Sequence, residues 1–485
     1  MQRTGIAVGL DLGTSSLKAI AVDTATGEVV ERVRQPYPTH RPEAGAAEQS
    51  PHDWMAAVIG ALGRLAAETD PNLWLGVGLS AMLPTLVRLD GAGEAIGNAI
   101  VWEDSRAEAA AGELVQSESR ATAYRNTGQL LDGRYLVPMA RRLRSVGQTP
   151  DSPVDQIVGA KDYIFGRLTG EILTDPSTAA GSGVYNLHTG HYASGDWERL
   201  PEVAAATTIR PLAPGVARLL GVPAGLPVAL GAADSVLGAE ALGARVGRDI
   251  AIISGTSTVV LGLRERLTFD PRERALVTPL ALGGYAFEMD LVATGSAFQW
   301  LARLTGAGSP EELLAEAAEV DPRSAPSVLP FLGPGEQGAL WDPALRGGFT
   351  GLTLGTTRAQ LMRGLTTGIL LELRRCVSVL AETPDARILV AGSSLAAEFL
   401  LQDLSDATGL PVLADRSEAD HSALGAVDVL LEGIGVAAAR ESRKFDAFTP
   451  NPEAANLWAD LARRHEHAIV QERERVSNHG ESDAA

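Results

Sequence analysis

Hydrophobic residues open the chain in two short runs that are separated by a small polar turn. Residues 6 to 23, IAVGLDLGTSSLKAIAVD, hold two apolar, β-branched segments, and the second alternates between apolar and polar positions. A half-buried strand shows this period of two, so the segment predicts a β-hairpin with a polar tip. The pattern returns at residues 250 to 263, IAIISGTSTVVLGL, with the turn Gly255-Thr256-Ser257 in place of Gly13-Thr14-Ser15. The repeat, about half the chain apart, indicates two halves of similar design.

Helical and strand-like segments alternate between and after the two hairpins. The segment 52–68, HDWMAAVIGALGRLAAE, has a helical period, whereas LWLGVGL at 73–79 and LPVALGAAD at 226–234 are short apolar runs typical of buried strands. In the second half, residues 357–382 predict a long helix, and ARILVAGSS at 386–394 predicts a strand that ends in a tight turn. Strands that alternate with helices predict an α/β fold. We place the domain boundary near Gly243 to Arg248, with domains at 1–243 and 244–485.

The composition narrows the classes of protein and of partner. At 485 residues and 45% hydrophobic content, the chain is long enough for two cores, because single cores stop growing near roughly 250 to 300 residues. The formal net charge of -19 disfavours nucleic acid as a partner, since binding to phosphates rests on Lys and Arg. The single cysteine, Cys376, excludes a disulfide within the chain and has the position of an inert core thiol in the predicted long helix.

Targeting and membrane signals are also missing from the sequence. The N-terminus, MQRTGIAVGLDLG, lacks the basic region, apolar run and cleavage site of a secretory signal. No stretch approaches the roughly 20 uninterrupted apolar residues of a membrane helix. We therefore expect a cytoplasmic protein without a membrane partner.

The two Gly-Thr-Ser turns are candidates for binding phosphate. A loop of small residues brings backbone N–H groups close to phosphate oxygens, because glycine has no Cβ to block the approach. One such turn alone is more often a plain hairpin tip, but the duplication favours a shared function. The chain has no GxxxxGK[ST] motif, which excludes a P-loop kinase.

Two aspartates lie where strands end beside turns of small residues. Asp11 precedes the first turn in an apolar run, where an unpaired carboxylate is unfavourable. It either binds a cation or caps its own turn, and the sequence leaves both open. Asp234 ends the run LPVALGAA, in the place of a general base that takes the proton of a hydroxyl. The alternative is an N-cap of the helix that follows.

The segment NAIVWEDSRAE combines the ring of Trp102 with three charged side chains, Glu103, Asp104 and Arg106. Sugar sites use such mixtures, because the apolar faces of a sugar pack on rings while its hydroxyls need polar partners. A surface cluster of ion pairs is an equally good interpretation of this segment alone.

Taken in order, these segments resemble the FGGY carbohydrate kinases. The family order is an Asp-x-Gly-Thr hairpin, a Glu-Gln segment, Trp-x-Asp-x-Arg, a central Gly-x-x-Asp, Gly-Thr-Ser and a late glycine turn. The corresponding segments are DLGTSSLK at 11–18, Glu48-Gln49, WEDSR at 102–106, GAAD at 231–234, Gly255 to Ser257 and AGSS at 391–394. Further matches are KDYIFGRLTGEILTDPSTAAG from Lys161, LPFLGPGE from Leu329, WDPALRGGFTGLTLGTTRAQLMRG from Trp341 and HSALGA from His421. The resemblance covers nearly the whole chain and implies a two-domain, actin-like fold of the ribonuclease H type with a cleft between the domains.

The resemblance also implies a reaction and a set of site residues. The reaction is ATP-dependent phosphorylation of a hydroxyl of a small sugar, polyol or aldonate, with ATP and Mg²⁺ as cofactors. By position, Asp234 is the base and Asp11 helps to hold the metal. The phosphate and nucleotide sites are lined by Gly13, Thr14, Ser15, Ser16, Gly255, Thr256, Gly295, Gln299, Gly392 and Ser393. The substrate site is lined by Met82, Trp102, Glu103, Asp104, Arg106 and Asp234.

Two places depart from the family pattern. The first of the paired late glycines is Ala391 here, at a point where the backbone approaches adenosine in the family. In the sugar segment, xylulokinases commonly carry a histidine where this chain has Pro84, and glycerol kinases carry Arg-Glu where it has Leu83 and Pro84. The FGGY gluconokinases often show Ser-Ala-Met, which is similar to residues 80–82. An arginine could receive an aldonate carboxylate, and Arg134 lies beside Tyr135 where the pocket loop of the family passes.

The acceptor therefore stays open between a pentulose such as xylulose and gluconate, and two other functions compete. A sugar-responsive pseudokinase or binding protein would explain the altered sugar segment and Ala391, but it has no need for Asp234. An actin-like or chaperone ATPase has no reason to carry WEDSR or Glu48-Gln49. We expect a small-molecule substrate as the partner and leave a homodimer open.

Overall fold

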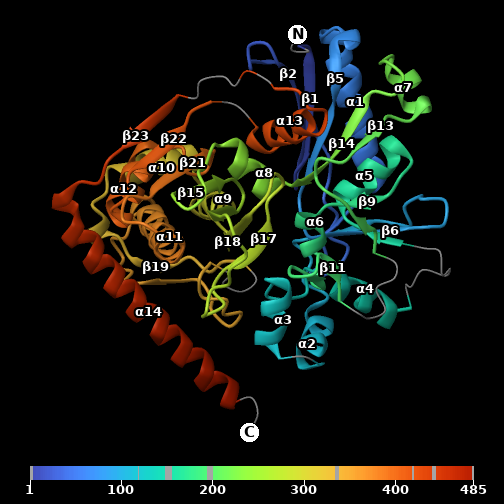
Figure 1. Ribbon diagram of the computed structural model, residues 1–485. Coiled ribbons are helices and arrows are strands. Elements are labelled where there is room, and N and C mark those ends of the chain that lie inside the picture. Colours follow the sequence, from blue (N-terminus) through green and yellow to red (C-terminus); the bar gives the residue numbers. More distant parts are fainter. Residues whose placement is uncertain are drawn as a thin grey trace. The chain divides into compact units, whose positions relative to one another are not determined.

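The protein divides into two compact units of α/β structure (Figure 1). The computed structural model describes residues 4–117, 119–147, 156–193, 200–333, 338–417, 420–437, 439 and 444–482. The first unit consists of Met1–Gly243, Glu265–Ala286 and Glu418–Ser442, and the second of Ala244–Arg264, Phe287–Ser417 and Arg443–Ala485. The first segment ends where we placed the boundary, after Gly243. Two later segments return to the first unit, however, so neither unit is one continuous stretch of chain.

A six-stranded sheet forms the centre of the first unit. Its order is β13-β14-β5-β1-β2-β3, formed by Ile209–Pro211, Pro227–Ala233, Trp74–Ala81, Ile6–Leu12, Ser16–Asp23 and Val29–Pro36. β1 and β2 pair antiparallel with Asp11 opposite Lys18, and β5 runs parallel to β1. The structure thus confirms the hairpin predicted at 6–23 and the buried strands predicted at 73–79 and 226–234.

Helices cover both faces of this sheet (Figure 1). α1 (Pro51–Glu68) and α5 (Ala160–Thr169) share one apolar core with the even-numbered residues of β1. Side chains alternate between the faces of a strand, and a Cβ built on Gly9 would lie 2.1 Å from the carbonyl oxygen of Ala423 in α13 (His421–Gly433). α13 therefore covers the opposite face and lies close to the backbone of the strands.

Shorter elements complete the first unit. A second sheet has the order β4-β7-β6-β8, formed by Glu48–Gln49, Ala99–Val101, Thr85–Leu89 and Gln156–Val158. The remaining helices are α2 (Glu108–Ser117), α3 (Arg120–Thr127), α4 (Leu136–Ser145), α6 (Pro176–Ala180), α7 (Pro214–Leu220) and α8 (Asp234–Ala241). The remaining strands are β9 (Leu173–Thr174), β10 (Tyr185–Asn186), β11 (His191–Tyr192), β12 (Glu202–Val203) and β17 (Leu276–Pro279).

The second unit repeats the strand order of the first. Its strands run β18-β16-β15-β21-β22-β23, formed by Tyr285–Leu291, Thr258–Arg264, Asp249–Ser254, Arg387–Gly392, Val412–Asp415 and Phe445–Phe448. β15 and β16 pair antiparallel around the second Gly-Thr-Ser turn, and β21 runs parallel to β15. In each sheet the hairpin is followed outward by two parallel strands and then by an antiparallel strand. The predicted repeat of one design is confirmed in the topology of the sheets.

A long buried helix, α11 (Arg358–Leu380), is the main helix of the second unit and confirms the helix predicted at 357–382. Cys376 is buried in it, as expected of a core thiol. Glu372 of α11 is also buried and lies 2.6 Å from His465 of α14 (Ala455–Ser482), so an internal polar contact joins the two helices. The other elements are α9 (Gly295–Thr305), α10 (Pro310–Ala318), α12 (Glu398–Thr408), β19 (Ser327–Leu329) and β20 (Gly348–Thr350).

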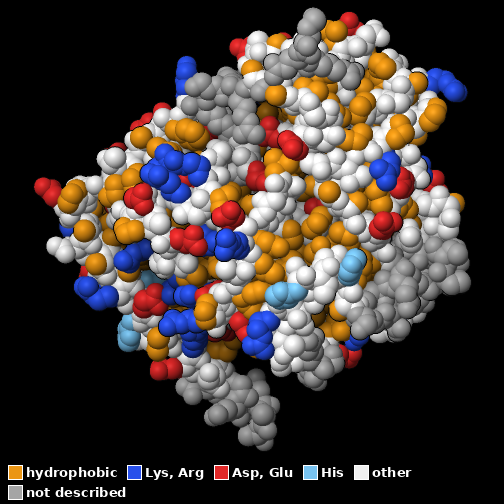
Figure 2. All heavy atoms as spheres, in the orientation of Figure 1, with side chains coloured by type: hydrophobic (Ala, Val, Ile, Leu, Met, Phe, Trp, Pro, Cys, Tyr) orange, Lys and Arg blue, Asp and Glu red, His pale blue; other side chains and the backbone are white. Residues whose placement is uncertain are grey.

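Charged side chains on the surface lie close to charges of opposite sign. On the face in Figure 2, acidic and basic side chains are interspersed. One example is Arg358, which binds Glu312 and Glu316 of α10. Among the residues that the structure describes, no helix is long and apolar enough to cross a membrane.

Candidate active site

The first Gly-Thr-Ser turn is held by hydrogen bonds from several elements of the first unit. Gly13 N donates to Ser16 O at 3.2 Å, which closes the turn between β1 and β2. The hydroxyl of Tyr37 donates to Gly13 O, and the Nε2 atom of Gln49 donates to Thr14 O at 2.7 Å. With its carbonyl oxygens bound from outside, the turn keeps one shape. Such a turn can present its N–H groups to an anion without reorganising.

The Glu-Gln segment and Trp102 support this turn rather than stand apart from it. The Oε1 atom of Gln49 accepts from Trp54 Nε1 at 2.9 Å, which fixes which end of the amide faces the turn. Trp102 Nε1 donates to the hydroxyl of Thr14 at 3.1 Å. The indole of Trp102 is only partly buried, so one part of the ring orients the turn while another part remains accessible.

Asp11 is buried at the end of β1, next to the turn. Its carboxylate accepts from Ser80 Oγ at 2.8 Å and lies 3.4 Å from Lys18 Nζ. Lys18 also lies 2.5 Å from Asp420, whose carboxylate caps α13 by accepting from Ala423 N. The pKa of Asp11 is raised to about 6, mainly by burial and in part by the charge of Asp420, while Lys18 and Ser80 act in the opposite direction.

These contacts bear on the two roles that the sequence left open for Asp11. The partners of its carboxylate are side chains of β2 and β5, so the structure gives no support to a turn cap. The residues that the structure describes hold no group of three or more His, Cys, Asp or Glu side chains that could hold a metal ion by themselves. Mg²⁺ commonly keeps several waters and binds one or two carboxylates together with substrate phosphates, so a single aspartate beside a phosphate turn fits its chemistry.

Asp234 begins α8 directly after β14. The N-cap of α8 is Ala233, so the alternative interpretation of Asp234 as the N-cap was wrong. Its Oδ1 atom accepts from Ser235 N at 2.8 Å, and its carbonyl oxygen accepts from Ser422 Oγ of α13 at 2.9 Å. The carboxylate of Asp234 thus lies at the N-terminus of α8 and is bound there by a backbone N–H group.

Gly231 explains how β14 delivers Asp234 to this position. It has a φ of +73°, and a Cβ built on it would lie 1.7 Å from the carbonyl oxygen of Leu79. The register between β14 and β5 shifts at this point, between Ala229 and Ala232. Glycine is required here for both reasons, which accounts for the first residue of the GAAD segment.

The charges of Asp11 and Asp234 both act on the hydroxyl of Tyr37. Burial raises the pKa of Tyr37, and the charges of Asp11 and Asp234 raise it further. The strands agree with this, because Asp11 of β1 and Ala232 of β14 both pair with Ser80 of β5. Since Tyr37 binds the carbonyl of Gly13, the two carboxylates and the first turn form one cluster within the first unit.

The charged residues of WEDSR are engaged with one another and with neighbouring loops. Asp104 is buried and accepts from Ala47 N at 2.9 Å and from Arg106 Nε at 2.9 Å. Arg106 also pairs with Glu48 at 2.7 Å, and Glu103 pairs with Arg41 at 2.6 Å. The interpretation of the segment as a cluster of ion pairs is therefore confirmed, but Asp104 is buried and does not lie at the surface.

Two further residues near the predicted sugar segment have defined partners. Met82 is buried, and its N–H donates to Leu12 O at 2.9 Å. The guanidinium of Arg134 lies 2.7 Å from the carboxylate of Asp132, and its Nε also donates to that group. Arg134 therefore has a carboxylate partner within its own loop.

The second Gly-Thr-Ser turn is bound by the start of α9. Thr256 O accepts from Ser296 N at 3.1 Å, and Gly295 N donates to Gly255 O at 3.2 Å. A Cβ on Gly295 would lie 2.4 Å from Gly255 O, so only glycine allows this approach. Gln299 is exposed on the same helix, one turn further on.

The late glycine turn follows β21. Gly392 has a φ of +101°, and a Cβ on it would lie 1.9 Å from Ser254 O, so the close approach of the backbone occurs at this residue. Ser393 beside it is exposed. Ala391 is buried and pairs with Ile253 of β15, so its methyl group belongs to the core of the second unit. The alanine in place of the first paired glycine is thus accommodated by packing.

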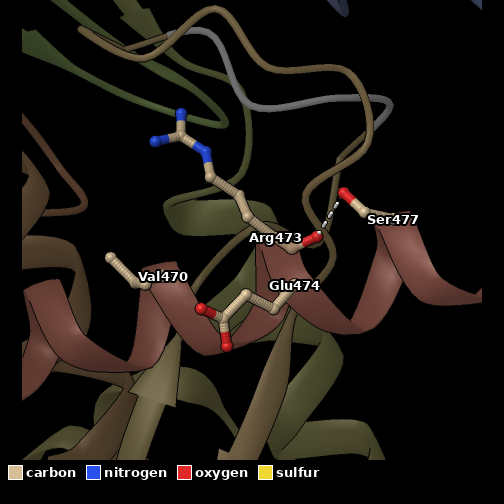
Figure 3. Close-up of a pocket in the computed structure, with 4 residues that line it drawn as sticks. All are labelled: Val470, Arg473, Glu474 and Ser477. Atoms are coloured by element: carbon tan, nitrogen blue, oxygen red, sulfur yellow. Dashed lines mark hydrogen bonds between the residues drawn. The ribbon is translucent and has the colours of Figure 1, made fainter.

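A separate hollow lies along α14, a segment of the chain that contains none of the predicted site residues. Figure 3 shows its four lining residues, Val470, Arg473, Glu474 and Ser477, all on one helix. Ser477 Oγ donates to Arg473 O at 2.9 Å, and Arg473 Nε donates to Asp342 at 2.8 Å. The lining contains none of the residues that the sequence predicts for the active site, so we do not assign it to that site.

Sequence reasoning assigned no role to Tyr37, Ser80, Lys18 or Asp420. The register of the hairpin was one available signal, because it puts Lys18 opposite Asp11. A second was the position of Asp420 before HSALGA, which is typical of a helix N-cap. Neither pattern could indicate that Asp420, far along the chain, meets Lys18.

Comparisons with known proteins show the family of the chain and agree with its fold. Residues 6–241 match the profile of the FGGY family of carbohydrate kinases, N-terminal domain, and residues 250–430 match that of its C-terminal domain. The chain is 25% identical over 462 residues to the gluconokinase of Bacillus subtilis (strain 168), with 89% of this chain and 88% of the relative covered. It is 29% identical over 422 residues to the xylulose kinase of Klebsiella pneumoniae, with 83% and 85% covered.

Solved structures are similar over nearly their full length. The xylulose kinase from Rhodospirillum rubrum has a TM-score of 0.85 and 26% identity, with 98% of this chain and 100% of that chain covered. The gluconate kinase from Lactobacillus acidophilus has a TM-score of 0.86 with 96% and 97% covered, and at 23% identity it shows the fold alone.

Proposed function

The chain belongs to the FGGY family of carbohydrate kinases, and on that basis we propose that it transfers the γ-phosphoryl group of ATP to a hydroxyl of a small sugar, polyol or aldonate. The observation that carries the proposal furthest is the cluster of Asp11, Asp234 and the first turn around Tyr37. It combines a carboxylate for the acceptor hydroxyl, a carboxylate for a cation and N–H donors for phosphate.

The division of labour follows from the position of each group. Asp234 accepts the proton of the acceptor hydroxyl while the hydroxyl oxygen attacks the γ-phosphorus, and ADP leaves with the electron pair of the broken P–O bond. Asp11 would hold Mg²⁺, which would supply positive charge to neutralise the phosphate oxygens during transfer. The turn around Thr14 and Ser15 donates N–H groups to phosphate. In the second unit, Gly255, Thr256, Gly295, Gln299, Gly392 and Ser393 bind the nucleotide.

The acceptor is best sought among pentuloses and aldonates. Relatives named gluconokinase and xylulose kinase support both classes. A relative named glycerol kinase, from Alkalilimnicola ehrlichii (strain ATCC BAA-1101 / DSM 17681 / MLHE-1), is 29% identical to this chain, as is the xylulose kinase. Glycerol is less favoured, because Leu83 and Pro84 stand where glycerol kinases carry an Arg-Glu pair. Trp102, the buried Met82 and the charged residues Glu103, Asp104 and Arg106 form or support the substrate site. Nothing in the cluster favours a protein without turnover.

A substrate screen tests the proposal. Purified protein with ATP and Mg²⁺ is incubated with xylulose, ribulose, gluconate, glycerol, erythritol or a deoxy-sugar, and ADP release is measured. We expect xylulose or gluconate to raise ADP release above the rate without acceptor. If no acceptor does so, the proposed reaction is wrong.

Replacing the base tests its role separately. Asp234→Asn should lower kcat by about 10² to 10⁴ and leave ATP binding largely intact, because the amide keeps the shape but cannot take a proton. Asp53→Asn is the matched control, since Asp53 also lies in the first turn of a helix in the first unit. An equal loss of ATP affinity in Asp234→Asn would indicate a structural aspartate instead.

A further inference from the structure

A buried cluster of charges lies in the segment that begins at Lys161. The proposed function assigns no role to this cluster. The side chains of Lys161, Asp162 and Asp175 are exposed by only 1 to 2%. Lys161 Nζ lies 3.0 Å from Asp162 Oδ1 and 3.2 Å from Asp175 Oδ1. One buried cation thus joins α5 to the residue that caps α6.

Stability alone does not explain such a cluster. Charges taken out of water lose hydration, and apolar residues of similar volume often serve stability equally well or better. Both carboxylate oxygens of Asp175 nevertheless accept hydrogen bonds from neighbouring protein groups. Its Oδ1 atom accepts from Thr178 Oγ1 at 2.6 Å, and its Oδ2 atom accepts from Ser177 N at 2.9 Å and from the hydroxyl of Ser177. Because these hydrogen bonds fix the carboxylate of Asp175, Asp175 can in turn fix the orientation of the Ser177 hydroxyl.

The cluster reaches the backbone beside Asp234 through the hydroxyl of Ser177. Ser177 Oγ accepts from Ala233 N at 2.9 Å, and Ala233 is the residue directly before Asp234. Because Ser177 gives its own hydroxyl proton to Asp175, its lone pairs are the part that faces Ala233. The orientation of this hydroxyl is therefore set by the buried carboxylate and not by rotation of the serine.

The main chain at Asp234 is then bound on both sides. Ser177 binds the N–H before it, and Ser422 of α13 binds its own carbonyl oxygen at 2.9 Å. The glycine bulge at Gly231 fixes how the strand arrives. Phosphoryl transfer depends on a base placed within hydrogen-bond reach of the acceptor hydroxyl, and a displacement of about 1 Å can lower the rate by about 10².

We propose that Ser177, oriented by Asp175 and Lys161, is a positioning residue for the carboxylate of Asp234. The inference rests on the proposed function, in which Asp234 is the base. It gives the Lys161 segment a role in turnover: a buried ion pair orients one hydroxyl, the hydroxyl holds one N–H, and the N–H fixes the start of α8.

The test removes the hydroxyl and measures kcat and KM separately. Ser177→Ala leaves Ala233 N without its acceptor, so we expect kcat to fall about tenfold or more while KM for ATP changes by less than about twofold. Ser177→Thr keeps a hydroxyl and should restore most of the turnover. Ser405→Ala is the matched control, because Ser405 of α12 is likewise buried and its hydroxyl binds two backbone carbonyls in the second unit. It should lose stability without losing kcat.

A double-mutant cycle with Asp234→Asn separates positioning from a general loss of structure. If Ser177 acts through the carboxylate, Ser177→Ala should lower the residual kcat of Asp234→Asn by no more than about twofold. An unchanged kcat in Ser177→Ala, or the same tenfold loss in both backgrounds, overturns the inference. If Asp234→Asn itself keeps full turnover, the assignment of the base fails instead, so the two failures are distinguishable.

The ionic part of the network is tested with Asp175→Asn. The amide keeps the size of the side chain but no longer accepts at both oxygens, so the Ser177 hydroxyl loses its fixed orientation. We expect a loss of kcat in the same direction as Ser177→Ala, and no further loss when the two are combined. Additive losses would show that Asp175 affects turnover by another route and would overturn its part of the inference.

Discussion

Glu240 illustrates what a single buried carboxyl does to the pH dependence of this protein. It lies in α8, and its Oε1 atom accepts from Leu282 N at 3.2 Å. Its Oε2 atom is buried and has no hydrogen-bond partner among the residues that the structure describes. The pKa of Glu240 is raised to about 7, mainly by burial and to a smaller extent by the nearby charge of Asp428. The folded protein therefore favours the neutral carboxyl, which is the form that needs least hydration.

The sign of the resulting pH effect follows from proton binding. Between the ordinary glutamate pKa of 4.5 and about 7, the folded state holds a proton on Glu240 that the unfolded state has lost, so folding stability falls as the pH rises through this window. Glu240→Gln is neutral at every pH. Its stability relative to the wild type should increase by about 3 kcal/mol from pH 4.5 to above pH 7. Urea unfolding at pH 5 and pH 8 measures the change.

The exposed Glu28 provides the control for this measurement, because Glu28→Gln makes the same chemical change at a carboxyl that is not buried. A pH-independent difference for Glu240→Gln would show that Glu240 is not neutral in the folded protein.

At the scale of elements, α13 packs directly on the backbone of the central sheet. A Cβ built on Gly78 of β5 would lie 1.9 Å from the carbonyl oxygen of Ala426 in α13, and Gly9 of β1 meets the same helix. Glycines on one face of the strands let the helix approach, and α13 then delivers Asp420 to Lys18 and Ser422 to Asp234. The close packing of α13 on the strands therefore affects the positions of Asp420 and Ser422 in the candidate site.

An alanine at Gly78 tests this packing. Gly78→Ala should push α13 away and lower the free energy of unfolding by at least about 2 kcal/mol, because neither backbone can move aside without breaking other contacts. Gly63→Ala is the opposite case, since a Cβ there meets nothing within 4 Å in the middle of α1. It should raise stability by about 0.5–1 kcal/mol through its better helix propensity. Thermal unfolding compares both variants, and equal effects would contradict the close approach of α13.

At the scale of the whole molecule, the first unit depends on a helix from near the C-terminus. α13 (His421–Gly433) belongs to the first unit, although it follows β22 of the second in the chain. Residues 1–243 alone would leave the face of β1 and β5 that α13 covers exposed to water. A boundary read along the sequence therefore does not mark a part that folds by itself.

Truncation after Gly243 makes this expectation measurable. The fragment 1–243 should lack a cooperative unfolding transition and should bind a hydrophobic dye, because the apolar face beneath α13 is uncovered. Adding the fragment 244–485, which carries α13, should reduce dye binding. A fragment 1–243 that unfolds cooperatively, with the near-ultraviolet circular dichroism of a packed core, would contradict the dependence on α13.

The sequence alone was enough to predict the main elements and the family, and to single out candidate site residues. Strand and helix periods are local, and turns such as Gly13-Thr14-Ser15 need only neighbouring residues, so the hairpins, the buried strands and α11 could be predicted. An ordered series of motifs was enough to indicate a carbohydrate kinase. Asp11 and Asp234 could be singled out because each ends an apolar run, where a carboxylate needs a reason.

Only the tertiary structure decided which groups meet. Lys18 contacts Asp420, Ser177 binds the N–H before Asp234, and WEDSR forms an ion-pair network, and each contact joins residues far apart in the chain or depends on which face is buried. Hydrogen bonds and ion pairs are short-ranged and directional, so their partners depend on packing within a few ångströms. Residue types and spacing reveal that a carboxylate is present, but its neighbours determine whether it binds a proton, a metal or an arginine.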